Sequence, residues 1–432
     1  MYCGYIVELK SLRKHDNADR LLCTEVFGNN VIVSTDCYHE GQLCVFFPID
    51  GKIGLEFAEK NNLLRKKDEN GRNIGGYLDP EKRNIRALKL RGERSEGLLL
   101  PIESLSDYAN INEFKVGDQI TILNGITICE KYIPVNKKSS SDLKGTNDKK
   151  QKSKIIDYPL FLEHYDTAQL AYNMNAFRPG DTIYITLKMH GTSNRVGNLI
   201  EERRKRNVIR KLFNLPAKIN SQWKIISGTR RTIIKDYNNG FYGSNTFRKQ
   251  YNDFFEDKLP KGFTVYMEIV GYVDDASTPI MGKCSNKLVN DKEFEKMYGK
   301  ETVFSYGCSE GKSDIYVYRI THTNIDGVVT EIPWEEVKIW CEKWGCKAVP
   351  EFEKFLFTSQ EDLMERVNRY LEGADPIGKI HTREGVVVRI DNREKFTAYK
   401  HKSWYFKVLE GIIKENSQEA DMEEAEELIQ DE

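Results

Sequence analysis

Residues 136–154, with the sequence NKKSSSDLKGTNDKKQKSK, constrain the fold most strongly, because this stretch cannot belong to a folded core. It holds seven lysines and no large apolar residue except Leu143. Such a segment buries too little apolar surface to offset the entropy that is lost on ordering. We therefore predict a flexible basic linker over residues 136–157, and the 432 residues leave room for a folded domain on each side of it.

The charge of the chain is distributed unevenly. Residues 415–432 hold nine acidic side chains and no basic ones, so we predict an acidic tail, a frayed helix or disordered, over residues 411–432. The rest of the chain then carries 65 basic against 57 acidic side chains. This surplus is compatible with a polyanionic partner.

Cysteine usage and hydropathy narrow the cellular setting. The nine cysteines form no CxxC pair, which argues for reduced thiols and against a structural zinc site or a disulfide framework. No apolar run has the length of a membrane span, and the first residues, MYCGYIVELKS, lack the pattern of a signal peptide. We expect a cytoplasmic protein without a membrane partner, and a nuclear location is the alternative.

Short strand-like runs separated by turns occupy residues 1–135. The runs are YIVEL, LLCTEVF, VIVST, LCVFFPI and QITIL. Five short strands at this spacing predict a small β-barrel, of which the OB-fold is the commonest kind and an SH3-like barrel the alternative. Two phrases inside it, KHDNADRLL and LKLRGERSEGLLLP, resemble a turn of tRNA-binding OB domains and a stretch of the N-terminal domains of certain RNA ligases.

Longer apolar strands mixed with helical periodicity occupy residues 158–410, which predicts a second, α+β domain. The strands are TIYITL, GFTVYMEIVGY, DIYVYRI and EGVVVRI, and the amphipathic helices are EEVKIWCEKW and EDLMERVNRYLE. The first helix places Val337, Trp340, Cys341 and Trp344 on one face, which indicates core packing rather than a site.

The stretch TLKMHGTSN, residues 186–194, ends one of these strands with Lys188. Gly191 follows, where a glycine permits a sharp turn or the close approach of a ligand. A lysine at a strand end is usually solvated, so this stretch alone leaves a surface lysine and a nucleophile as alternatives.

Other stretches add charged groups in unusual places. Glu268 lies inside the apolar strand YMEIVG, and Glu384 stands at the head of the apolar run EGVVVRI. Buried carboxylates need a cation, a donor or a metal. Lys400 and Lys402 in TAYKHK would project side by side from a strand, which favours an anion such as phosphate between them. Because no Walker A, GxGxxG or HExxH pattern is present, this phosphate chemistry would depend on side chains.

The ordered set KMHG, YMEIVG, EGVV and KHK resembles the covalent nucleotidyltransferases, and the histidine of KMHGTS resembles the RNA ligase 2 and RNA-editing ligase branch. FLEHYDTAQL and the N-terminal barrel are similar to RNA ligases with an OB domain in front. The resemblance implies an N-terminal OB-like RNA-binding domain followed by a nucleotidyltransferase domain built on antiparallel sheets. It further implies an ATP-dependent RNA ligase that joins RNA 3′-OH and 5′-phosphate ends through a lysyl-AMP, uses Mg²⁺ or Mn²⁺, and acts as a monomer.

Residue roles follow from the same resemblance. Lys188 would be the nucleophile, His190, Lys400 and Lys402 would complete the catalytic set, and Glu268 and Glu384 would hold the metal directly or through water. The nucleotide would be contacted by Gly191, Arg230, Arg231, Glu268, Tyr316, Tyr318, Lys400 and Lys402. Taken singly, each has another interpretation, such as strand-core packing for the two tyrosines or an exposed edge strand for the two lysines.

Three positions depart from the family pattern. Leu187 stands where this branch carries glutamate, Ser193 where asparagine or arginine is common, and Arg319 where an acid usually follows the stacking aromatic. These departures put the preference for ATP in question. In addition, the stretch around residues 201–220 resembles an insertion, whose basic residues between 203 and 211 would face RNA or solvent.

Two other functions remain as alternatives. A DNA ligase or a capping guanylyltransferase generally carries an OB domain after the last lysine motif, but only 30 residues follow Lys402. A non-catalytic tRNA- or RNA-binding protein is the alternative of a different class, because the front domain and the linker alone would suit it.

Overall fold

The computed structural model describes residues 2–71, 73–133, 156–164, 167–205, 216–238, 245–273 and 278–415. The chain divides into two compact units, Met1–Pro134 and Val135–Glu432. The predicted linker lies outside the described residues except for its last two, and the predicted tail lies outside them from residue 416 onward. Most of the basic stretch that we assigned to an insertion also lies outside them.

Unit 1 consists of short strands with one short helix, α1 (Leu55–Lys60). Its strands are β1 (Gly4–Glu8), β2 (Arg13–His15), β3 (Ala18–Val26), β4 (Asn29–Ser34), β5 (Leu43–Phe47), β6 (Gly51–Ile53), β7 (Lys66–Lys67), β8 (Asn73–Gly75), β9 (Ala87–Leu90), β10 (Glu93–Glu96), β11 (Leu98–Pro101), β12 (Gln119–Ile120), β13 (Ile122–Leu123), β14 (Ile126–Thr127) and β15 (Cys129–Lys131). Two 3-10 helices, η1 (Ile102–Leu105) and η2 (Ile111–Glu113), lie between the last strands.

A four-stranded sheet in the order β11-β5-β1-β12 and a three-stranded sheet in the order β2-β3-β4 form the centre of unit 1. Successive side chains of a strand point to opposite faces, and both faces of the central strand β5 are buried. Two apolar clusters result, one around Ile6, Val45 and Phe47 and one around Phe46, Val31 and Leu99. The predicted strands of this unit are therefore present, in the architecture of a small β-domain.

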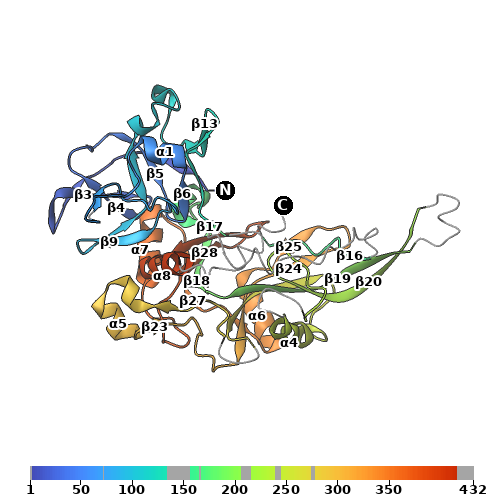
Figure 1. Ribbon diagram of the computed structural model, residues 1–432. Coiled ribbons are helices and arrows are strands. Elements are labelled where there is room, and N and C mark those ends of the chain that lie inside the picture. Colours follow the sequence, from blue (N-terminus) through green and yellow to red (C-terminus); the bar gives the residue numbers. More distant parts are fainter. Residues whose placement is uncertain are drawn as a thin grey trace. The chain divides into compact units, whose positions relative to one another are not determined.

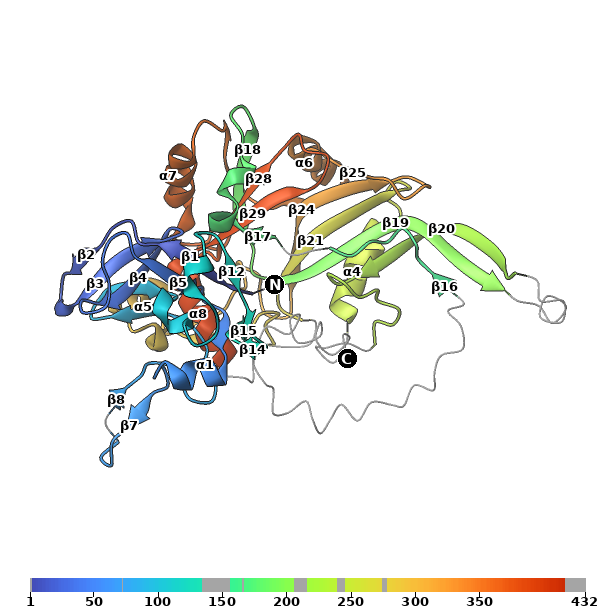
Figure 2. The same ribbon diagram turned by 90° about the horizontal axis from the view of Figure 1, so that it is seen from above.

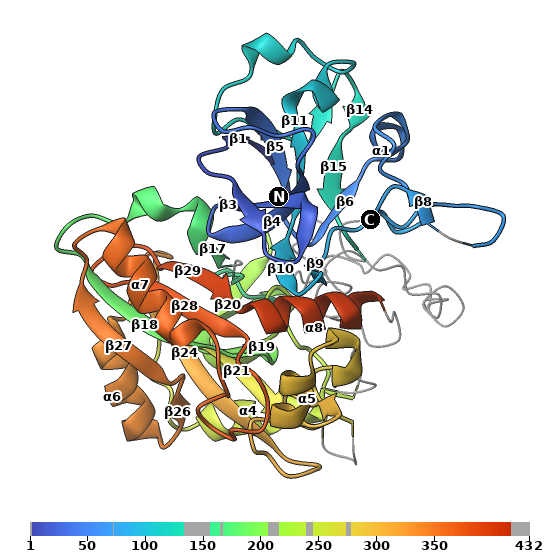
Figure 3. The same cartoon turned by 90° about the vertical axis from the view of Figure 1, so that its left-hand side faces the viewer.

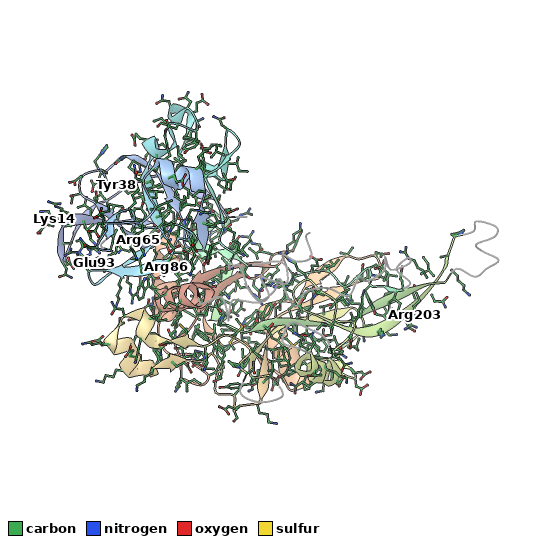
Figure 4. The ribbon with its side chains drawn as sticks, viewed as in Figure 1. Lys14, Tyr38, Arg65, Arg86, Glu93 and Arg203 are labelled. Carbon is green, nitrogen blue, oxygen red and sulfur yellow. The ribbon has the colours of Figure 1, made fainter. Side chains whose placement is uncertain are left out.

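The two motif-bearing turns of unit 1 meet in space. Arg13, before the HDNADRL turn, forms an ion pair with Glu93 of the RGERSEG turn, and the backbone N–H of Asp16 donates to Glu93 Oε1 at 3.2 Å. Figure 4 shows Lys14 and Glu93 at the same end of the unit. Two stretches that are far apart in the sequence thus build one edge of the domain.

Unit 2 contains the longer strands. They are β16 (Ile156–Asp157), β17 (Ala168–Gln169), β18 (Thr182–Lys188), β19 (Thr192–Lys205), β20 (Lys218–Gly228), β21 (Phe263–Gly271), β22 (Cys284–Ser285), β23 (Glu301–Thr302), β24 (Ser313–Thr323), β25 (Val329–Glu331), β26 (Lys347–Ala348), β27 (Glu351–Leu356), β28 (Gly385–Ile390) and β29 (Thr397–Lys402). Its helices are η3 (Leu170–Tyr172), η4 (Met174–Ala176), α4 (Thr246–Phe255), η5 (Asn286–Val289), α5 (Lys292–Tyr298), α6 (Trp334–Trp344), α7 (Gln360–Leu371) and α8 (Trp404–Glu415).

Two mostly antiparallel sheets organise unit 2. One has the order β16-β19-β21-β24-β25, with β20 beside β19 and β26 beside β24. The other has the order β17-β29-β28-β18-β27, whose strands lie side by side in Figures 2 and 3. Only β17–β29 and β24–β26 pair in parallel among the named pairs. The α+β class and the antiparallel sheets expected from the sequence are confirmed.

The helices pack as their apolar spacing predicts. Val337, Cys341 and Trp344 of α6 are buried, and Trp340 is half-buried against Phe263 with ring centres 5.1 Å apart. Leu363 and Val367 of α7 are fully buried in the core beneath β28 and β18. No helix in the described part of the chain is long and apolar enough to cross a bilayer.

Two boundaries of unit 2 differ from the sequence-based division. Residues 156–157 pair with β19 as β16, so the end of the predicted linker is part of a sheet. Residues 411–415, which we placed in the tail, continue α8 because apolar residues of the helix, such as Phe406 and Leu409, are buried.

Strands β19 and β20 continue beyond their sheet as a two-stranded ribbon (Figure 1). Glu201 anchors this ribbon: the carboxylate is fully buried and accepts from Arg203, Gln222 and Lys224. Burial opposes ionisation, but these three donors hold the pKa of Glu201 at about 2. Arg203, which is labelled on the ribbon in Figure 4, is therefore already paired with an acid of the same chain.

Candidate active site

A pocket lies between the two sheets of unit 2. It encloses about 750 Å³ of space, its open mouth included. The five-stranded sheet contributes Lys188, Val387 and Lys400, and the other sheet contributes Glu268 and Tyr318. The sequence motifs that we grouped by chemistry therefore come together in one cavity.

Lys188 is the last residue of β18 and pairs in register with Gly385 of β28. This register places Glu384 beside it, and Lys188 Nζ lies 2.6 Å from Glu384 Oε1. The Glu384 side chain is only 2% exposed, while that of Lys188 is 22% exposed. The candidate nucleophile is thus held by a buried carboxylate and still reaches the pocket.

His190 is absent from the pocket lining. Its ring packs edge-on between Phe304 and Phe406, each with its centre 4.7 Å away, and its Nδ1 is 3.9 Å from Glu384 Oε2. Burial lowers the pKa of His190 well below the ordinary value; nearby Glu410 opposes this shift and Lys188 adds to it. His190 is therefore neutral at pH 7 and shapes the surroundings of Glu384 rather than adding a positive charge.

Buried neutral histidines predict a pH-dependent stability. Burial lowers the pKa of His401 to about 3, whereas an unfolded histidine titrates near 6.5. Below about pH 6.5 the unfolded chain binds a proton that the folded chain does not, so stability falls as the pH decreases, by up to about 1.4 kcal/mol per unit for one such group. Urea unfolding of wild type and His401→Gln at pH 7.5 and 5.5 measures this, and we expect the variant to lose about 1 kcal/mol less between the two pH values. Equal losses in the two proteins would contradict the assignment.

Two glycines are required by close backbone approach. A Cβ on Gly191 would lie 2.4 Å from the carbonyl oxygen of Ile269, and one on Gly385 would lie 2.1 Å from that of His401. Gly385 also has a φ of 149°, whereas Gly191 is not in the left-handed region. Gly191 stands at a bend of the chain, as expected, and packing adds a second reason for glycine, because it lets the chain pass against β21.

A β-bulge explains how β24 presents side chains to the pocket. Tyr266 pairs with Arg319 and Met267 with Val317, which leaves Tyr318 as the extra residue. A bulge redirects side chains, and Tyr318 reaches within 3.5 Å of the Ser193 hydroxyl and lines the pocket. Tyr316 does not line it but is buried 5.4 Å from Lys347, so the structure separates the two tyrosines that we proposed for stacking.

Of the four remaining basic candidates, two line the pocket and two do not. Arg230 and Lys400 line the pocket. Arg231 does not: it is exposed, and its carbonyl accepts from Arg195 Nη2 at 3.0 Å. Lys402 is absent from the lining as well, because both oxygens of Glu410 on α8 hold its Nζ, at 2.7 and 2.8 Å. The anion that we expected beside Lys402 is thus, in this structure, a carboxylate of the chain itself.

Several residues of the lining were not singled out from the sequence, among them His164, Arg389 and Phe396. His164 belongs to the quoted stretch FLEHYDTAQL, but nothing in that stretch showed that its histidine would reach the cavity. Arg389 donates to the carbonyl of Tyr318 and covers Trp334, and its burial lowers the pKa of its guanidinium to about 10. Each of these residues comes from a different strand or loop, so only the folded structure shows that they share a pocket.

The carboxylates fit a hard divalent cation. Glu384 Oε2 is buried and has no hydrogen-bond partner among the described residues. Glu384 does not itself line the pocket but holds Lys188, which does, and Glu268 is part of the lining. No cluster of three or more His, Cys, Asp or Glu side chains occurs in the described ranges. Mg²⁺ and Mn²⁺ commonly take one or two carboxylates and complete their shell with water and substrate phosphates, so a two-glutamate site is sufficient.

An OB-fold unit followed by two antiparallel sheets around a lysine-containing pocket defines the class of nucleotidyltransferases with an N-terminal OB domain, and the comparisons agree. A family model described as RNA ligase matches residues 181–408, more than half of the chain. A second, described as an OB-fold domain, matches residues 5–102. The chain belongs to the RNA ligase family.

Solved structures share this fold over almost the whole chain. A mutant of the Naegleria gruberi RNA ligase with AMP and Mn has a TM-score of 0.57 at 17% identity, covering 94% of this chain and 97% of that one. A second mutant, with ATP and Mn, has a TM-score of 0.55 at 18% identity, covering 94% and 98%. The same enzyme with PPi has a TM-score of 0.55 at 17% identity, covering 93% and 96%. No curated protein matches this chain.

Proposed function

We propose that this RNA ligase is ATP-dependent and that Lys188 carries AMP as a covalent intermediate. The observation that carries the proposal is the position of Lys188, which lines a pocket between two sheets while a buried glutamate holds its amine at 2.6 Å. The similar structures that contain AMP, ATP or PPi support the assignment of the pocket to a nucleotide.

The reaction has three steps. The amine of Lys188 attacks the α-phosphorus of ATP, a phosphorus–nitrogen bond forms, and pyrophosphate leaves. AMP then passes from Lys188 to the 5′-phosphate of an RNA end. Finally the 3′-hydroxyl of the other end attacks that phosphate, AMP leaves, and a phosphodiester joins the two ends.

The charges around Lys188 suit this sequence of steps. A lysine amine must lose its proton before it attacks, and Glu384 is the carboxylate within hydrogen-bond distance of that amine. Lys400 and Arg230 line the same pocket and would stabilise negative charge that develops on the phosphates. Tyr318 and Val387 line the pocket from opposite sheets and would hold the base between them.

A divalent cation would be held by Glu384 and Glu268. It would supply charge neutralisation on the phosphate oxygens, which side chains alone provide less well. Glu384 would then have two roles. Its Oε1 holds the Lys188 amine, and its buried Oε2, which has no hydrogen-bond partner among the described residues, would serve the cation.

Nucleotide labelling tests the proposal. Purified protein is incubated with α-³²P-labelled ATP or GTP and a divalent metal, and then run on a denaturing gel. Label transfer from ATP is expected; label from GTP alone would indicate a capping-type enzyme, and label from neither would contradict covalent nucleotidyl transfer.

Unit 1 is assigned to grip the RNA, and its removal gives a separate prediction. Without residues 1–135 the ligase loses binding energy for the RNA but keeps every pocket residue, so sealing should fall more than tenfold while lysyl-AMP formation changes less than about threefold. Both rates are measured on the same preparation, with thermal melting to show that the remaining unit is folded. Loss of both reactions in a folded protein would contradict this division of labour.

A further inference from the structure

We propose that His164 contacts the nucleoside part of the bound nucleotide through its Nε2–H, and that Arg319 holds the His164 ring in the tautomer and orientation which this contact needs. The inference rests on the proposed function, because it adds a nucleotide-binding residue and a positioning residue to the same pocket. Arg319 is one of the positions at which this chain departs from the family pattern described above.

The β-bulge of β24 brings Arg319 to the pocket side of its sheet. Because Tyr318 is the extra residue, Arg319 pairs with Tyr266, two residues before Glu268 on β21. Its guanidinium carbon lies 4.6 Å from the ring centre of Tyr266 and 4.8 Å from that of Phe396. Tyr318 therefore lines the cavity, and Arg319 packs behind it against Phe396, another residue of the lining.

Arg319 is fixed on its other side by an acid. Its Nε donates to Glu331 Oε2 at 2.9 Å, and its Nη2 is paired with Glu331 Oε1. The two side chains are only 6% and 13% exposed. A two-point ion pair fixes the plane of the guanidinium, and this leaves Nη1 directed at a defined neighbour.

That neighbour is His164. Arg319 Nη1 lies 3.1 Å from His164 Nδ1. A guanidinium only donates hydrogen bonds, so Nδ1 must accept, and the single proton of a neutral imidazole is then on Nε2. The backbone N–H of His164 also donates to the carbonyl of Arg230 at 2.9 Å, which holds the main chain at the pocket wall.

The chemistry of the wall favours a nucleoside group as the acceptor. The His164 ring lies 5.4 Å from Tyr318 and 6.2 Å from Phe396 between ring centres, and all three residues line the pocket. A neutral N–H among aromatic rings is a suitable donor to a base nitrogen or a ribose hydroxyl. The phosphates would instead be bound by the positive charges of Lys400 and Arg230. Leu187, also in the lining, offers no side-chain hydrogen bond of its own.

The first test measures lysyl-AMP formation by His164→Ala against ATP concentration. Loss of one hydrogen bond to the nucleotide should raise KM about tenfold, with kcat changed less than about threefold. The matched control is His322→Ala, because His322 lies on β24 against Phe263 and is absent from the pocket lining. An unchanged KM in folded His164→Ala would overturn the proposal.

Analogues identify the acceptor. If the base accepts, the KM penalty of His164→Ala is the same for ATP and 2′-deoxy-ATP. If the ribose 2′-hydroxyl accepts, the penalty disappears with 2′-deoxy-ATP, because wild type already lacks the contact. Either result supports contact with the nucleoside. If His164→Ala raises the KM for inorganic pyrophosphate in the reverse reaction as much as the KM for ATP, the proposal is overturned.

A double-mutant cycle tests the positioning role of Arg319. Arg319→Gln is made together with Glu331→Gln, so that no buried carboxylate loses its counter-charge. We expect KM to rise about fivefold, and to rise no further than in His164→Ala when all three changes are combined. Arg319→Lys, which keeps a donor, should recover part of the loss; additive effects or no KM effect in folded protein would overturn the role.

The two proposals fail in different ways. If wild type forms no covalent adduct with ATP, the proposed function itself is wrong. If wild type forms the adduct and His164→Ala binds ATP with the same KM, only the inference about His164 and Arg319 is wrong.

Discussion

We expect Lys188→Ala to abolish AMP attachment and RNA sealing, while the protein remains folded. Lys188 is the amine that we assign to the phosphorus–nitrogen bond, and alanine offers no nucleophile at that position. The loss should exceed 10⁴-fold, as expected when a covalent step has no substitute. The melting temperature should fall, because the variant leaves the 2%-exposed carboxylate of Glu384 without this partner, and the melting curve serves to show that the variant is still folded.

Lys354→Ala is the matched control for this result. Lys354 lies on β27, next to β18, and its Nζ is 3.0 Å from Glu335, outside the pocket lining. Its removal should leave AMP attachment within about twofold of wild type, since exposed ion pairs contribute little. Labelled ATP and a denaturing gel measure both variants, and residual labelling of Lys188→Ala at the wild-type rate would show that another residue is the nucleophile.

Glu384→Gln should cause the second-largest loss, at least 10²-fold in lysyl-AMP formation. Glutamine keeps the size of the side chain but removes the negative charge that holds the Lys188 amine and that we assign to the divalent cation. Without the carboxylate neither the Lys188 amine nor the cation is held, so a higher ATP concentration should not restore the rate of lysyl-AMP formation.

Stability distinguishes this effect from simple damage to the core. The carboxylate is 2% exposed, but its partner Lys188 reaches solvent, so we expect the variant to lose only about 1–3 kcal/mol of folding free energy. Urea unfolding measures this change, and a titration of Mg²⁺ or Mn²⁺ in the labelling reaction should show a raised metal requirement. A folded Glu384→Gln with the wild-type rate and metal dependence would remove Glu384 from the site.

The order of elements and the unusual placement of the main candidate residues could be predicted from sequence because they depend on local patterns. Alternating strands ended at Lys188 and Glu384 stood before an apolar run, so burial and charge could be inferred from neighbours a few residues away. Glu268 was visible in the same manner, as a carboxylate inside an apolar strand.

The rest depended on register and on distant segments. The bulge at Tyr318 separates it from Tyr316, although a regular strand would place both on one face. In the sequence Lys402 appears equivalent to Lys400, but Glu410 of α8 holds its Nζ. The predicted domain boundary at residue 410 fell inside this helix, so the contact could not be foreseen. His164 lies far from Arg319 in the chain, so their contact had no local signal.

The most direct measurement is mass spectrometry of peptides from protein treated with ATP and a divalent metal. Our account predicts an added AMP on the peptide that contains Lys188, at that side chain, and its removal on addition of pyrophosphate. An adduct at another residue, or no adduct in folded protein that seals RNA, would contradict it.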